Sequence, residues 1–146
     1  MESIDISFSH ILRDCTQLLI AFILPILTAW EREADARSAG LRTFPIVSMA
    51  ACSFTMLAVS MFPDPSAQAR LIQGIITGIG FIGGGAILKS DNKATGTSTA
   101  AAIWSTGAVG IAVGLWRLEI AIALSVMTFL TFLVLARVKK EVERNN

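Results

Sequence analysis

Five long stretches of the chain carry no charged side chain, and they restrict its fold more than any other feature. Each is close to the roughly 17–25 residues that a helix needs to cross a bilayer. Apolar residues make up 53% of the chain, and the mean hydropathy of +0.65 is typical of a membrane protein. We therefore predict an all-α integral membrane protein, a compact bundle of about five transmembrane helices in a single domain, residues 1–146. The stretches are Cys15–Trp30, Thr43–Pro63, Leu71–Leu88, Ala94–Trp116 and Ile120–Ala136.

The distribution of lysine and arginine predicts which side each connection faces. With the N-terminus outside, nine basic residues lie on the inner side and three, Arg13, Arg70 and Arg117, on the outer side. This favours an N-out, C-in orientation. The inner set is Arg32, Arg37, Arg42, Lys89, Lys93, Arg137, Lys139, Lys140 and Arg144. No basic leader with a cleavage pattern is evident, so we expect the first helix to remain as an anchor, with Ile11–Asp14 extending it.

The inner end of the first helix and the start of the second carry local signals. A helical extension is expected over Glu31–Ala39, with Glu33 and Arg37 at pairing distance and Gly40 at its end. Thr43 is expected to cap the second helix, because Pro45 is tolerated in a first turn.

The later connections are also short. Asp64 is expected to cap the third helix, with Pro65 at its first position. A polar loop is expected over Ser90–Ser98, with Ser98 or Thr99 capping the fourth helix. Cys15 and Cys52 lie in or beside apolar stretches without metal-type spacing, and we interpret both as small buried residues.

Glycine is dense in the third and fourth stretches. Each glycine inside a helix costs about 1 kcal/mol relative to alanine, so this density needs a reason. Small residues four apart let membrane helices approach closely, which predicts helix packing. The packing glycines are Gly74, Gly78, Gly80, Gly84, Gly107, Gly110 and Gly114. The run Gly83, Gly84, Gly85 has an alternative interpretation, an unwound helix end whose carbonyls meet an ion or small ligand.

The segment from Gly78 to Gly83 also spells G-x-G-x-x-G. That fingerprint binds dinucleotides only when it follows a strand and opens a helix. Here it lies inside an apolar stretch, so we reject a nucleotide site. The near-neutral net charge of +1 likewise argues against nucleic acid as a partner.

Several motifs in this order resemble the membrane domain of the MgtC/SapB family. They are Trp30-Glu31-Arg32-Glu33, Ala39-Gly40-Leu41-Arg42-Thr43, Gly78-Ile79-Gly80-Phe81-Ile82-Gly83-Gly84-Gly85, and Gly96-Thr97-Ser98-Thr99-Ala100-Ala101 with Trp104. The resemblance implies a multi-pass protein of the bacterial cytoplasmic (inner) membrane, linked to low-magnesium adaptation, survival in host cells and binding of other membrane proteins. It covers the membrane domain and not the cytoplasmic C-terminal domain that many members carry. It also places the family's outer acid at Asp64, farther from Arg70 than the family pattern has it.

The expected orientation brings the family motifs together on the inner side. Carboxylates, hydroxyls and free backbone groups there would suit a hard cation such as Mg²⁺, which retains several waters and needs one or two carboxylates. The alternative is purely structural, with Glu33 paired to Arg37 and the hydroxyls capping a helix. The candidate ligand or ion residues are Glu31, Glu33, Arg42, Gly83, Gly84, Gly85, Thr97, Ser98 and Thr99.

Catalytic patterns are lacking in the sequence. The one histidine, His10, lies outside any constellation, so we expect a non-enzyme without a required cofactor. One hypothesis is a regulator that contacts other membrane proteins, or a second copy of itself, through its small-residue helix faces. The other is a small transporter or channel for magnesium or another ion, for which a charged residue deep in a span is expected. Only Gln73, Thr77, Ser105 and Thr106 are expected to add polarity within the spans.

Overall fold

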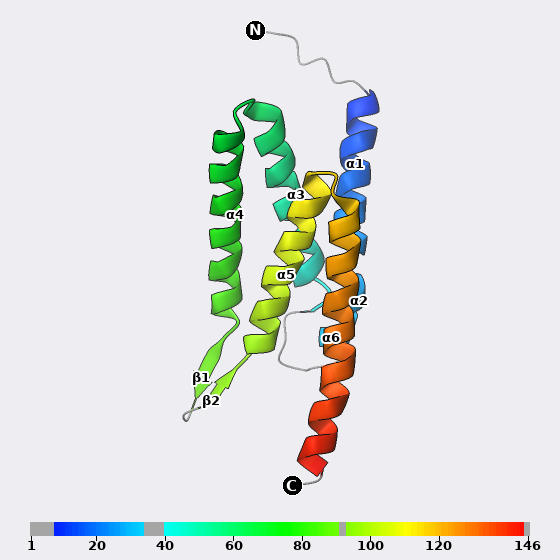
Figure 1. Cartoon of the computed structure of the whole chain (residues 1–146), viewed down its shortest axis with the longest axis vertical. Helices are drawn as coiled ribbons and strands as arrows, with labels where there is room; N and C mark the ends of the chain where they lie inside the picture. The colour runs from blue at the N-terminus through cyan, green and yellow to red at the C-terminus, as the bar shows by residue number, and fades with distance from the viewer. Residues whose placement is uncertain (1–7, 34–39, 91–92, 145–146) are drawn as a thin grey trace.

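The computed structural model describes residues 8–33, 40–90 and 93–144, which form helices and one hairpin (Figure 1). This confirms the all-α membrane bundle. The elements are α1 (Phe8–Ile23), α2 (Ile26–Glu33), α3 (Thr43–Met61), α4 (Pro65–Gly85), β1 (Leu88–Ser90), β2 (Lys93–Thr95), α5 (Thr97–Gly114) and α6 (Leu118–Arg144).

The first apolar stretch is two helices rather than one. The break falls at Leu24 and Pro25, because proline has no N–H to donate and its ring clashes with the preceding turn. The hydroxyl of Ser125 on α6 donates to the carbonyl of Leu24 at this break, at 2.5 Å. Helix α1 starts at Phe8, so the predicted extension through Ile11–Asp14 is confirmed.

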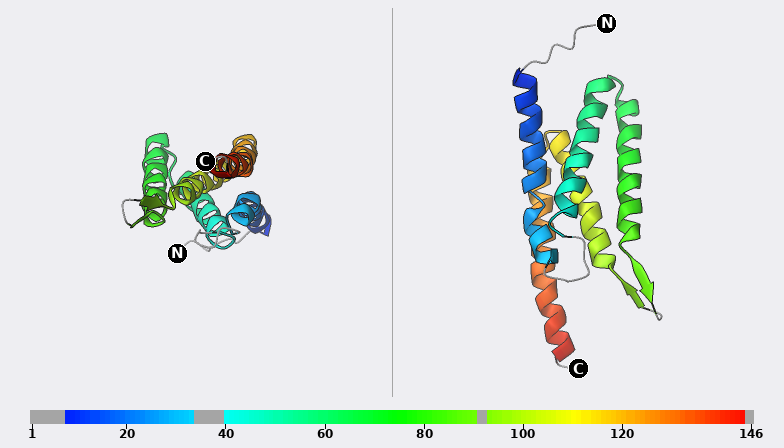
Figure 2. Two further views of the ribbon diagram at one scale, coloured as in Figure 1. Left: turned by 90° about the horizontal axis from the view of Figure 1, so that it is seen from below. Right: turned by 180° about the vertical axis from the view of Figure 1, so that it is seen from behind.

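Helix α5 lies in the centre of the bundle. It packs against α3, α4, α6 and α1, and ten of its residues are buried. Most of them are alanine, glycine, threonine or valine, whose small volume lets four helices surround a fifth. Helix α4, in contrast, stands at the edge of the bundle (Figure 2).

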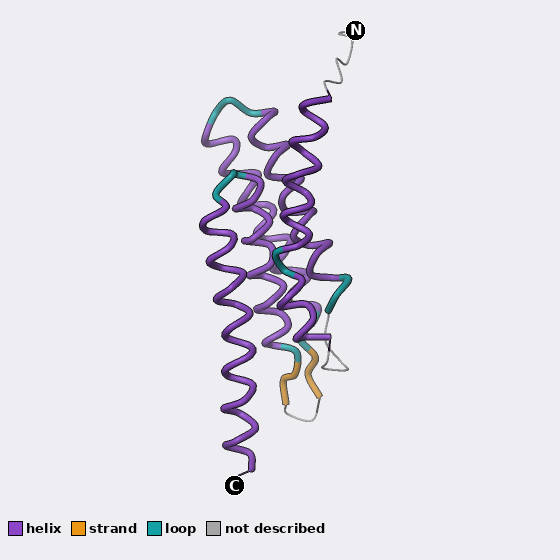
Figure 3. The backbone as a smooth tube through the Cα atoms, turned by 90° about the vertical axis from the view of Figure 1, so that its right-hand side faces the viewer, coloured by secondary structure: helices purple, strands orange, loops and turns teal. Residues whose placement is uncertain are grey.

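The connection from α4 to α5 differs from the predicted polar loop. Strands β1 and β2 pair antiparallel, with Leu88 opposite Thr95, and extend beyond the ends of α4 and α5 that they connect (Figure 3). Gly96 follows in the left-handed region at φ 83°, and a Cβ atom there would collide with the carbonyl oxygen of Ala86. Local hydropathy contains no signal for so short a hairpin.

Two of the three predicted helix caps are wrong. Thr43 is already the first residue of α3, because its N–H and that of Phe44 donate to the carbonyl of Gly40. Gly96, and neither Ser98 nor Thr99, occupies the cap position of α5. The cap at Asp64 with Pro65 at the first position of α4 is confirmed.

Three stretches in the described part of the chain are long and apolar enough to cross a membrane, Phe8–Glu33, Thr43–Met61 and Leu118–Leu135. Helices α4 and α5 have 21 and 18 residues and stand beside them, but glycine and small polar residues lower their hydropathy. Helix α1 begins at the end of the bundle opposite to that where α6 ends (Figure 1). An odd number of membrane crossings fits this placement, because it puts the start of α1 and the end of α6 on opposite sides.

Candidate functional site

The family motifs meet at the end of the bundle where α2 stops and α5 starts. The guanidinium of Arg32 donates from Nη2 to Oγ1 of Thr99 at 3.1 Å. Its Cζ atom also lies 5.0 Å from the ring centroid of Phe132 on α6, a cation–π contact. Thr99 is buried, whereas Thr97 and Ser98 are exposed. One side chain of the first motif thus ties three helices together.

Glu33 has a structural partner close to the second motif. Its Oε2 atom accepts from the backbone N–H of Leu41 at 2.9 Å. A Cβ atom at the buried Gly40 would collide with the same carboxylate. A larger residue at position 40 would therefore displace the Glu33 carboxylate from its bond to Leu41. The predicted Glu33 pair with Arg37 and the extension over residues 34–39 lie outside the described residues, while α2 ends at Glu33.

The glycine triplet ends a helix and does not unwind one. Gly83, Gly84 and Gly85 are the last residues of α4. The N–H of Ala86 donates to the carbonyl of Gly83 at 3.0 Å, and that of Ile87 to the carbonyl of Gly84 at 3.1 Å. These two carbonyls are already engaged, because the chain closes the helix with a tight turn. The predicted unwinding over these residues is wrong, because α4 continues to Gly85; an ion or ligand at this helix end stays a prediction.

The described residues at this end include no large cluster of metal-binding side chains. No group of three or more His, Cys, Asp or Glu side chains that could hold a metal occurs in residues 8–33, 40–90 and 93–144. Among the motif side chains, Arg32 reaches Thr99 on α5, and its positive charge repels a divalent cation. Glu31 is half-buried and Arg42 is exposed. Magnesium binding here stays a prediction.

Asp64 acts as a helix cap at the opposite end. Its carboxylate accepts from the N–H of Ser66 at 3.1 Å and from the Ser66 hydroxyl at 2.5 Å. These bonds, that of the hydroxyl first, hold the pKa of Asp64 below its usual value. Capping accounts for this acid, and a further role for it stays a prediction.

The predicted packing glycines fall into two groups. Those of α5 contact other helices. A Cβ atom at Gly107 would collide with Ile79, and one at Gly110 with the carbonyl of Ser48. A Cβ atom at Gly114 would lie only 2.7 Å from the Cβ atom of Thr55. Those of α4 do not, because a Cβ atom at Gly74, Gly78, Gly80 or Gly84 would meet no atom of the described chain within 4 Å. Of the α4 glycines, Gly83 approaches α5, because a Cβ atom there would lie 3.1 Å from the Ala100 carbonyl oxygen.

A pocket near the start of α1, lined by both polar and apolar side chains, was not predicted. It holds about 690 Å³ between α1, α3 and the turn from α5 to α6, and its lining includes His10, Arg13 and Asp14. Gln17 is buried at its base and donates from Nε2 to the carbonyls of Val113 and Gly114, at 3.0 and 3.4 Å. Arg13 stacks over Trp116, 5.8 Å from its ring centroid, and Trp116 has a φ of 58°. The sequence contains one signal for this pocket: Arg13 and Gln17 are four residues apart and therefore lie on the same face of α1.

The membrane spans contain more buried polar side chains than the sequence analysis predicts. Seven polar side chains are buried in the described chain, and Thr106 is the one among them that was predicted to add polarity within the spans. Gln73 and Thr77, for which the same was predicted, are exposed on α4. The full set is Gln17, Thr28, Ser48, Thr55, Thr99, Thr106 and Ser125.

A bundle of apolar helices around a small-residue central helix, with short connections, defines a multi-pass membrane protein. Comparison with known proteins gives its family: the MgtC family profile matches residues 18–141, and the chain belongs to this family. It is 34% identical to SrpB of Synechococcus elongatus, over 85% of this chain and 74% of SrpB. It is equally identical to MgtC of Salmonella typhimurium (87% and 52%) and to YhiD of Escherichia coli K12 (78% and 56%). The chain thus spans about half the length of MgtC and YhiD. No solved structure gives a significant match.

Proposed function

We propose that this protein is a regulator in the bacterial cytoplasmic membrane that acts, without catalysis, by helix-to-helix contact with another membrane protein during adaptation to low magnesium. The observation that carries the proposal is the outer face of α4. Its glycines leave a surface where another helix can approach closely. The link to magnesium rests on membership of the MgtC family.

The outer face of α4 combines three properties of a helix-docking surface. Gly74 and Gly78, and Gly80 and Gly84, form two small-residue pairs at a spacing of four with open space above them. Phe81, at 85% exposure, projects between the pairs. Gln73 adds an exposed amide, which in a bilayer gains from a hydrogen bond across to a partner helix. The position of α4 at the edge of the bundle leaves this face accessible (Figure 2).

The test places a photoreactive phenylalanine analogue at Phe81 and crosslinks in native membranes. We expect a specific adduct that Gly78→Leu or Gly84→Leu removes, while the melting temperature of the purified protein stays unchanged because no neighbour in the chain is displaced. Ala123→Leu, which places the same leucine side chain at an exposed position on α6, should leave the adduct intact. No adduct, or an adduct insensitive to both glycine substitutions, would contradict the proposal. An adduct of twice the chain mass would identify a second copy as the occupant.

Transport of magnesium or another small ion is the second candidate. Two observations favour it: the pocket that His10, Arg13, Asp14 and Gln17 help to line, and the name of YhiD, which assigns that relative provisionally to magnesium transport. Magnesium flux into proteoliposomes, compared with empty vesicles, separates the two functions. A regulator gives the same flux as empty vesicles, whereas saturable flux that Gln17→Leu alters would establish transport in its place.

A further inference from the structure

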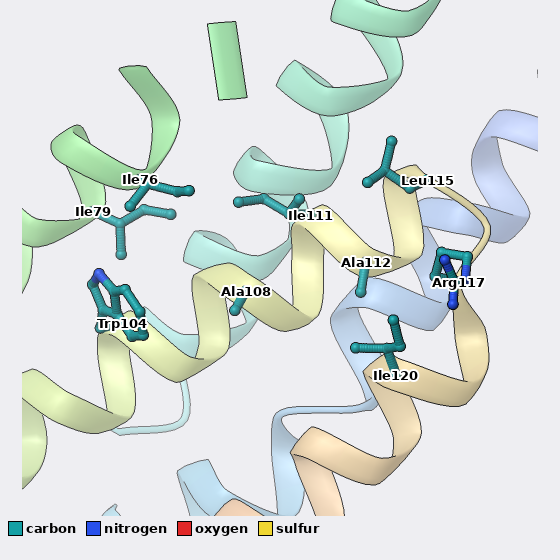
Figure 4. A pocket seen from close by; sticks show the side chains of 9 residues that line it. All are labelled: Ile76, Ile79, Trp104, Ala108, Ile111, Ala112, Leu115, Arg117 and Ile120. Atoms are coloured by element: carbon teal, nitrogen blue, oxygen red, sulfur yellow. The ribbon is translucent and has the colours of Figure 1, made fainter. Parts of the chain in front are cut away.

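An apolar groove runs along the outside of the bundle between α4, α5 and α6. It holds about 310 Å³. Ala108 and Ala112 of α5 form its floor, Ile79 of α4 one wall and Ile120 of α6 the other (Figure 4). Trp104 lies at one end and Arg117 at the other. The two alanines lower the surface between two walls of isoleucine, so the groove follows from the sequence of α5.

The length of the groove matches one leaflet of a bilayer. Trp104 and Leu115 lie about 16 Å apart along the axis of α5, from the rise per residue of an α-helix. Half of the hydrocarbon core of a bilayer measures about 15 Å. With Arg117 at the membrane surface, Trp104 lies near the midplane. A single acyl chain that enters from the Arg117 side would fill the groove from end to end.

Arg117 lines the groove, and its side chain pairs with Glu119 next to it. The Nε atom of Arg117 donates to Oε1 of Glu119, and both side chains are more than half exposed, at 59% and 63%. The pair leaves the Nη groups of Arg117 and the second oxygen of Glu119 available for other partners. A phosphate suits the guanidinium, and an ammonium that can donate hydrogen bonds suits the carboxylate.

We propose that this groove binds a phospholipid with a phosphoethanolamine headgroup. One acyl chain lies over Ala108 and Ala112, the phosphate contacts Arg117, and the primary ammonium donates to Glu119. A phosphocholine lipid fits less well because its ammonium has no N–H to donate. An anionic phosphoglycerol lipid fits less well because Glu119 opposes it. The site is independent of the α4 face proposed above for a partner helix.

The test uses Trp104 as the reporter. A chain with Trp30→Phe and Trp116→Phe is reconstituted in vesicles, and quenching of Trp104 fluorescence is measured with dibrominated phosphatidylethanolamine, phosphatidylcholine or phosphatidylglycerol. We expect a several-fold higher relative binding constant for the ethanolamine lipid than for the other two. Lipid carried by the unmodified protein in native mass spectrometry, with the same order of preference, guards against an effect of the tryptophan substitutions.

Three variants test which residues cause the preference for the ethanolamine lipid. Glu119→Gln and Arg117→Gln should each reduce the relative binding constant to about one, because each removes one half of the charge pair. Ala108→Phe should reduce quenching by all three lipids, because the ring fills the floor. Arg70→Gln, a control that removes an exposed cation on α4, should change nothing. Equal binding of the three lipids, a preference for the anionic lipid, or a preference that survives Glu119→Gln would overturn the proposal.

Discussion

Arg32 shows how much one side chain can decide in this bundle. It reaches from α2 to Thr99 on α5 and to Phe132 on α6. A guanidinium suits this place because it donates hydrogen bonds in its plane and stacks on an aromatic face, which a lysine ammonium does less well. Glu33 acts similarly at shorter range, by accepting from Leu41 beside Gly40.

The hydroxyl of Thr99 should matter for stability while its neighbour does not. Thr99→Val keeps the shape but removes the acceptor of a charge-assisted hydrogen bond, so we expect a loss of about 1–3 kcal/mol in the free energy of unfolding. Ser98→Ala, at an exposed position in the same turn, should change it by less than about 0.5 kcal/mol. Unfolding of the detergent-solubilised protein by denaturant measures both. Equal effects would show that the contact contributes nothing.

Glycine serves a different purpose in each of the two glycine-rich helices. On α5, glycines let α3 approach so closely that the Ser48 carbonyl lies where a Cβ atom of residue 110 would be. On α4, glycines leave the outer face low and open. The same small-residue spacing thus serves internal packing in one helix and an external surface in the other.

Alanine substitutions should separate these two uses. Gly110→Ala forces α3 and α5 apart, because the new methyl group meets backbone of Ser48 and the Ala51 side chain, so we expect a loss of about 1–3 kcal/mol. Gly78→Ala meets nothing and removes the helix penalty of glycine, so it should be neutral or stabilise by up to about 1 kcal/mol. Thermal unfolding of the two variants side by side gives the comparison. A destabilising Gly78→Ala would mean that α4 packs on its glycine face in the isolated chain.

At the scale of the whole molecule, the loops carry a signal for which end of the bundle lies on the inner side of the membrane. The structure places the α3–α4 connection at one end and the β1–β2 hairpin at the other (Figure 1). The excess of lysine and arginine predicts that the hairpin end is inside. The positive-inside rule acts during insertion, so this information lies in the composition of the loops and not in the packing.

Labelling of single cysteines tests this orientation. In a background with Cys15→Ser and Cys52→Ala, a membrane-impermeant maleimide should modify Ala69→Cys in intact cells. Ala94→Cys, in the hairpin, should react only after the cells are permeabilised, and both positions are exposed. The reverse pattern would show an N-in protein.

The sequence by itself determined the properties that depend on residues close to one another along the chain. The lengths of the apolar stretches predicted an all-α membrane bundle, Asp64 and Pro65 marked the start of α4, and the motif order indicated the family. Only the tertiary structure decided which surfaces meet. The partner of Arg32, the burial of Gln17, the division of the glycines and the groove beside Trp104 all depend on how each helix is rotated about its axis. That rotation is set by the combined packing of helices far apart in the sequence, and small-residue spacing occurs on packed and open faces alike.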